Sequence, residues 1–171
     1  HEKLWELLRS QGYNLDPVIF FVEKVAFDWL EKALPDKVNY ALVAGLEHFT
    51  AMFGEIYFEN PELVEQMHPE MRRLFEWHAA EEVEHKAVAY DQLLAIDDSY
   101  ALRTGVMNVT VVGFYMVTLL NTLYFMAQDK SLYNPKEWLT MYDVFFGKYD
   151  LARKTFVKFL EYYKPDFHPW D

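Results

Sequence analysis

Cysteine is absent from this chain of 171 residues. Its absence excludes a disulfide framework, a thiolate metal site and a cysteine nucleophile. Any bound metal ion must therefore have oxygen and nitrogen ligands, which favours iron, manganese or zinc. Basic residues are also scarce, since 16 Lys and Arg stand against 27 Asp and Glu and give a formal net charge of −11. Such a chain would repel phosphate, which argues against nucleic acid as a partner.

Repeats, low-complexity tracts and long linkers are also lacking, so we expect a single domain spanning residues 1–171. Apolar residues make up 52% and aromatic residues 18% of the chain. So many aromatics indicate either a large core or a surface that meets lipid or a hydrophobic substrate. There is no basic-plus-apolar signal segment, which predicts a cytoplasmic protein, with membrane association as an alternative. Because the chain opens at His1 without a methionine, we expect the C-terminal part of a longer protein.

The hydrophobic period is 3.6 residues throughout, and no run has the alternation of a strand. Proline, asparagine and aspartate residues separate the helical runs. The expected helices cover about residues 2–11, 16–34, 36–58, 69–96, 99–128, 135–147 and 151–163. The sequence therefore predicts an all-α bundle of six or seven helices.

The fifth expected helix has no charged residue from Thr104 to Ala127, and it is long enough to span a bilayer. Polar residues nevertheless recur along one side of it: Thr104, Asn108, Tyr115, Thr118 and Thr122. A polar stripe prefers a partner helix, a cavity or ordered water to lipid on all sides. We therefore predict the central helix of a soluble bundle here, and keep membrane attachment as the alternative.

Glu82 and His85 lie three residues apart in a helix-forming run, so they project from one face and can close on one metal ion. Glu47 lies in an earlier, largely apolar helical run, where a carboxylate must be neutral, paired or bound to metal. A Glu from one helix and a Glu-x-x-His from the next form half of the ligand set of a di-iron or di-manganese bundle. The alternatives are a surface pair of Glu82 with Lys86 and an exposed His85.

Three neighbouring residues are further candidates. His78 lies one turn before Glu82, and is either another metal ligand or an ordinary buried histidine. Glu81 is the candidate catalytic carboxylate. It lies about 100° around the helix from Glu82, where it can accept a hydrogen bond from a ligating imidazole on another helix. Its alternative is a solvated carboxylate. His48 points away from its neighbour Glu47, and we interpret it as structural or as a partner of a ligand.

One face of the helix of Glu47 is traced by Tyr40, Ala44, Thr50 or Ala51, and Gly54, and most of these residues are small. They leave room for a substrate, or they allow tight helix packing. Other chemistries lack support, since the chain has no nucleophile elbow, no Gly-rich phosphate loop and no His-Glu-x-x-His motif.

Residues 46–51, 77–91 and 163–171 together resemble the bacterial family named predicted metal-dependent hydrolases, and the resemblance covers essentially the whole chain. It implies a ferritin-like arrangement with two metal ions, in which Glu47 is the single-helix carboxylate and Glu82 and His85 are the Glu-x-x-His pair. The family is longer at its N-terminus, where a first Glu helix and a first Glu-x-x-His supply the other ligands. His1 matches a histidine that follows this segment, and is a further candidate ligand. The missing segment or a second copy of the chain would complete the site.

These observations predict first a di-iron oxidase or oxygenase that acts on a hydrophobic, lipid-like molecule. Two iron ions are the expected cofactors, with manganese or zinc as alternatives. A two-metal hydrolase, in which one ion activates water, is the second hypothesis. The third is a non-catalytic helical module associated with a membrane, whose ligand set is incomplete.

Overall fold

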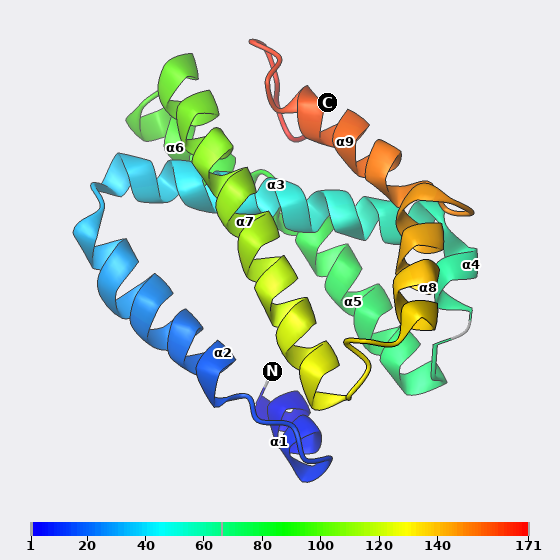
Figure 1. Cartoon of the computed structure of the whole chain (residues 1–171). Helices are drawn as coiled ribbons and strands as arrows, with labels where there is room; N and C mark the ends of the chain where they lie inside the picture. Colours follow the sequence, from blue (N-terminus) through cyan, green and yellow to red (C-terminus); the bar gives the residue numbers. More distant parts are fainter. Residues whose placement is uncertain (1, 66, 171) are drawn as a thin grey trace.

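The computed structural model describes residues 2–65 and 67–170, and every regular element in these ranges is helical (Figure 1). The elements are α1 (Glu2–Ser10), α2 (Asp16–Phe20), the π-helix η1 (Phe21–Glu31), α3 (Asp36–Glu59), α4 (Pro61–Val64), α5 (Pro69–His85), α6 (Val88–Ile96), α7 (Tyr100–Gln128), α8 (Pro135–Phe146) and α9 (Leu151–Glu161). The predicted all-α class is confirmed.

The helix boundaries follow the predicted ones closely, with two exceptions. The predicted helix 69–96 is interrupted at Lys86 and Ala87, which separate α5 from α6. The second exception is the single turn α4, which was not predicted, whereas α2 and η1 follow each other without a break, as expected of the helix 16–34. The local sequence at residues 86–88 contains neither proline nor glycine. The interruption between α5 and α6 is therefore made by tertiary contacts.

Helix α3 lies at the centre of the molecule, with α5, α6, α7 and α9 packed around it (Figure 1). Its buried positions are mostly small or apolar: Ala41, Ala44, Gly45, Phe49, Ala51, Met52, Gly54 and Ile56. The prediction that the charge-free helix would be the central one is wrong. In the described ranges α7 is the one helix long and apolar enough to cross a membrane, and only 6% of its apolar window is buried.

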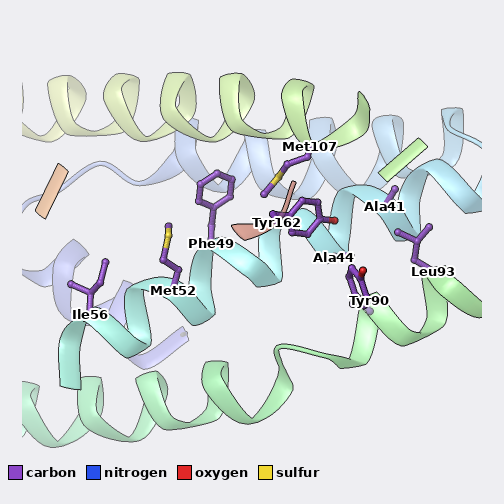
Figure 2. Close-up of a cluster of buried hydrophobic side chains, with 10 residues drawn as sticks. Ala41, Ala44, Phe49, Met52, Ile56, Tyr90, Leu93, Met107 and Tyr162 are labelled. Carbon is purple, nitrogen blue, oxygen red and sulfur yellow. The ribbon is translucent and has the colours of Figure 1, made fainter. Parts of the chain in front are cut away.

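The core forms where α7 and α9 meet α3, as Figure 2 shows for Phe49 and its neighbours. Phe49 stacks on Phe114 of α7 at a centroid distance of 4.8 Å and on Phe159 of α9 at 5.7 Å. Gly45 lets α7 approach α3, because a Cβ there would lie 3.2 Å from the sulfur of Met107. Complete burial of the Phe49 ring contributes about 1.5–3 kcal/mol to folding stability.

The segment after α9 is fastened to the core by Arg103, a buried cation of α7. Its guanidinium donates hydrogen bonds to the carbonyl oxygens of Tyr162 and Lys164. The hydroxyl of Tyr90 on α6 donates a further hydrogen bond, to the carbonyl of Phe167. These bonds satisfy backbone carbonyls after α9, and they hold residues 162–167 against α7 and α6.

Candidate metal centre

Glu47 projects from α3 toward the beginning of α6. Its Oε2 accepts a hydrogen bond of 3.1 Å from the backbone N–H of Ala89, in the first turn of α6. The first amides of a helix have no partner within the helix, and the helix dipole makes this end attractive to a carboxylate. Glu47 therefore caps α6 from a different helix, which accounts for the interruption after His85.

Burial is the largest influence on Glu47 and raises the pKa of its carboxyl group. The hydrogen bond from Ala89 and the charge of His85 act in the opposite direction, while the charge of Glu82 adds to the increase. The charges of Glu82 and His85 on α5 are thus close enough to influence the carboxyl group of Glu47 across the α3–α5 contact. A cation among them would offset both the burial of Glu47 and its repulsion from Glu82.

Glu82 is half-buried, and its neighbour is a histidine of its own helix. The Nε2 atom of His78 lies 3.4 Å from Oε1 of Glu82, and its Nδ1 lies 3.9 Å from Oε2 of Glu81. An imidazole of α5 itself thus lies near Glu81, and the hydrogen bond to an imidazole on another helix stays a prediction. The surface pair of Glu82 with Lys86 is wrong, because Lys86 Nζ lies 3.2 Å from Oε1 of Glu55.

Two carboxylates and an imidazole from facing helices have the donor chemistry of an iron, manganese or zinc site. Within the described ranges, however, no group of three or more His, Asp or Glu side chains is assembled around one point. His85, the last residue of α5, is exposed. His1 lies outside the described residues. The donor chemistry of Glu47, Glu82 and His85 thus fits a metal ion, and their role as ligands stays a prediction.

Gly54 sets the separation between α3 and α5. A Cβ built on Gly54 would lie 2.7 Å from the carbonyl oxygen of Ala79 and 3.2 Å from Cγ2 of Val83. No real Cβ tolerates the first of these distances. Of the two explanations for the small residues near Glu47, tight helix packing is the one that applies at this position, and it brings the helix of Glu82 against that of Glu47.

On another side of α3, Glu55 joins two lysines that sequence analysis did not connect with it. Its carboxylate lies 3.2 Å from Lys86 Nζ and 2.9 Å from Lys158 Nζ, and Lys158 also contacts Glu59 at 2.9 Å. Burial favours the neutral acid, but hydrogen bonds and charge from Lys158 and Lys86 outweigh it and lower the pKa of Glu55. These pairs fix the α5–α6 junction and α9 to α3. Charges so distant in sequence give no motif that could have revealed them.

A polar cavity of about 280 Å³ adjoins these lysines. His48 lines it and contacts the rings of Tyr162 and Phe167 at centroid distances of 5.0 and 5.3 Å. Burial lowers the pKa of His48 to about 4. The side chain thus packs toward α9, away from Glu47, as predicted from its place on the helix.

Comparison with known proteins adds one finding. A family model described as "Predicted metal-dependent hydrolase" matches residues 1–171. No curated protein and no solved structure gives a significant match.

Proposed function

This chain belongs to the family of predicted metal-dependent hydrolases, and on that premise we propose that it is a hydrolase whose metal ion is held by Glu47, Glu82 and His85. The observation that carries the proposal is the position of Glu47. Its carboxyl group is partly buried, lies beside His85 and Glu82, and has a pKa raised first by burial. A buried carboxylate next to a second carboxylate and an imidazole is an environment that a divalent cation stabilises.

When bound, such an ion acts as a Lewis acid that lowers the pKa of water and stabilises negative charge in the transition state. Glu47 would be held in place by its hydrogen bond to the first turn of α6. His78 lies between Glu81 and Glu82, so these carboxylates orient its ring, and we assign it to proton transfer at Nε2. Glu81 acts through His78 and is therefore a positioning residue in this proposal.

The hydrolytic function was the second hypothesis from the sequence, behind a di-iron oxidase. The family description supports metal-dependent hydrolysis, and the oxidase gains no support from the comparisons. The donor set suits iron, manganese and zinc alike. The number and identity of the ions are therefore measured in the experiment below.

An apolar substrate is supported by a groove of about 740 Å³ between η1 and α3. Phe27 and Leu30 of η1 face Val43 and Leu46 of α3 across it. Val43 precedes Glu47 by one helical turn, so both lie on one side of α3. The volume is that of a typical small-molecule site, and the lining suits an acyl or other hydrocarbon group.

The test combines metal content with activity. The purified chain is analysed by inductively coupled plasma mass spectrometry, then assayed on p-nitrophenyl esters of increasing acyl length before and after chelation. We expect hydrolysis that disappears with the chelator and returns with iron, manganese or zinc, and that increases with acyl length. Glu47→Gln and His85→Ala should lose metal and activity, whereas Glu84→Gln, an exposed neighbour, should retain both. Activity that survives complete metal removal contradicts the proposal, and a strict requirement for dioxygen and a reductant would restore the oxidase.

A further inference from the structure

The side of α7 that faces away from α3 carries a continuous strip of apolar side chains, bordered by the exposed Asn108 and Tyr115. Five of its side chains are between 50% and 70% exposed. They recur every three or four residues, except for one adjacent pair, and so share one side of the helix. Two glycines complete this face, and a Cβ on either would meet nothing within 4 Å. We call this face the outer strip: Gly105, Val109, Val112, Gly113, Met116, Leu119 and Leu120. A helix on the surface of a soluble protein normally turns a polar side to water.

The opposite side of α7 is fixed to the rest of the molecule. Arg103, Met107 and Thr110 are buried, and Phe114 stacks on Phe49 of α3. Figure 1 shows α7 crossing α3, with α7 nearer the viewer. At its far end the hydroxyl of Tyr124 donates a 3.0 Å hydrogen bond to the carbonyl of Asn14. Both ends are therefore anchored, and the helix cannot turn its outer strip inward without losing these contacts.

Three threonine hydroxyls of α7 form hydrogen bonds within the helix itself. The hydroxyls of Thr104, Thr110 and Thr122 donate to the carbonyls of Tyr100, Val106 and Thr118 at 2.8, 3.0 and 2.8 Å. No charged residue occurs from 104 to 127. Thr104 and Thr122 of the predicted polar stripe are thus bonded within α7, and Asn108 accepts a 2.8 Å hydrogen bond from the Tyr163 hydroxyl. Bonds of this kind lower the cost of placing a polar group beside hydrocarbon.

We propose that the outer strip of α7 inserts into the surface layer of a lipid bilayer, with the helix lying along the membrane plane. Only 6% of the apolar window of α7 is buried within the described residues, which differs from a core helix, and α7 begins only at Tyr100, which differs from a signal sequence. A perpendicular span is excluded because α3 packs on α7, so that Glu47 and Glu55 would enter hydrocarbon at high cost. A helix that lies in the interface inserts its apolar side by about 5–10 Å.

A second copy of the chain fits the outer strip less well. The strip consists of five large side chains and two glycines, fewer than the roughly 20–30 residues that each partner contributes to a standard stable interface. The strip also offers no polar side chain to fix the orientation of a protein partner, whereas about one hydrogen bond per 100–200 Å² is usual. Lipid needs no such partner. Because the net charge is −11, the lipid should be zwitterionic, since an anionic surface would repel the chain.

Flotation tests the proposal with the full chain and phosphatidylcholine vesicles. Wild-type protein should float with the vesicles, and adding anionic lipid should not strengthen binding. The variant Val109→Gln/Val112→Gln/Met116→Gln should bind at least tenfold more weakly. As a matched control, Phe156→Gln/Val157→Gln removes similarly exposed apolar side chains from α9 and should bind as wild type. Circular dichroism checks that each variant is folded. Wild-type protein that stays with the unbound fraction overturns the proposal, as does lipid-independent self-association that the α7 variant abolishes.

The lack of cysteine allows a second, position-specific measurement that does not depend on the triple variant. A single Val112→Cys substitution carries an environment-sensitive fluorophore, and Val157→Cys serves as its counterpart on α9. With vesicles the label at position 112 should shift to the blue and be quenched by brominated lipid, while the label at 157 remains unchanged. Equal responses at the two positions, or none at 112, would refute insertion of the outer strip. Neither measurement requires metal or hydrolytic activity, so the outcome is independent of the proposed function.

Discussion

Replacing Gly54 with alanine should weaken the contact between α3 and α5 on which the candidate metal centre depends. The new Cβ would lie 2.7 Å from the carbonyl oxygen of Ala79, whereas ordinary van der Waals contact begins near 3.4 Å. The two helices must therefore separate by about 0.7 Å at this point, the difference between these two distances. The obstacle is a backbone carbonyl, so rotation of a side chain cannot relieve it.

Two energies compete in this substitution. Alanine gains about 1 kcal/mol over glycine in a helix interior, whereas overpacking of a closely fitted contact costs about 1–3 kcal/mol. A matched control separates them, because Gly113 also lies inside a helix but has open space around its Cβ position. Gly113→Ala should therefore stabilise the protein by about 0.5–1 kcal/mol. The difference between the two variants isolates the steric cost and should be about 1–3 kcal/mol.

Urea unfolding followed by circular dichroism measures this difference, and titration with zinc or manganese measures its effect on the site. Because Val83 lies at the crossing and Glu82 is its neighbour, a movement of α5 also moves the candidate ligands away from Glu47. Metal affinity should fall at least tenfold in Gly54→Ala, since ligand positions tolerate only about 0.5 Å. It should be unchanged in Gly113→Ala. Equal stabilities, within about 0.5 kcal/mol, would refute the close approach of α3 and α5.

Three further predictions concern charged groups around α3. Glu47→Gln keeps an oxygen that can accept the hydrogen bond from the α6 amide, but it removes the charge. The free energy of unfolding should therefore change by less than about 1 kcal/mol, while metal affinity, measured by titration, should fall at least tenfold. Glu55→Gln leaves two partly buried lysines without their shared carboxylate and should cost about 1–3 kcal/mol in urea unfolding, whereas Glu59→Gln, at a side chain 52% exposed, should cost under about 0.5 kcal/mol. Burial lowers the pKa of His48 to about 4 in the folded protein, whereas a histidine in an unfolded chain has a pKa of about 6.5. Between these two pH values the unfolded chain therefore binds more protons than the folded protein. Stability should fall by on the order of 3 kcal/mol between pH 6.5 and 4, and His48→Phe should lack that part of the slope.

Local sequence determined most helix boundaries, because capping residues act over three or four positions. The Ser99 hydroxyl accepts from the Leu102 amide, and the Asn134 side chain accepts from the Lys136 amide. Both helices begin where these residues predicted. The interruption after His85 could not be predicted in this way, since the carboxylate that fills it comes from Glu47, 42 positions away from the amide it accepts from.

Hydrophobicity likewise identified α7 as a helix, but it led to the wrong prediction that α7 is the central helix of the bundle. Periodicity and hydropathy report that a surface is apolar, and they do not report what covers it. Helix α3, which carries more charge, became the central helix because its small residues admit neighbours closely, as Gly45 does for α7 and Gly54 does for α5. The same limit applies to the candidate site. Spacing predicted that Glu82 and His85 would lie near Glu47, but the partner of Lys86 depends on how α3 meets the α5–α6 junction.

The position of α3 implies that metal binding and membrane binding can be altered separately. One side of α3 carries Glu47 toward α5 and α6, and another receives α7 through Gly45 and Phe49. The outer strip lies on the far side of α7 from these contacts, so substitutions there change no residue that touches α3. A variant such as Val112→Gln should therefore lose lipid affinity without losing metal, and Gly54→Ala should lose metal affinity without losing lipid. If both properties failed together in either variant, α7 and the candidate centre would have to be coupled through a movement of α3 itself.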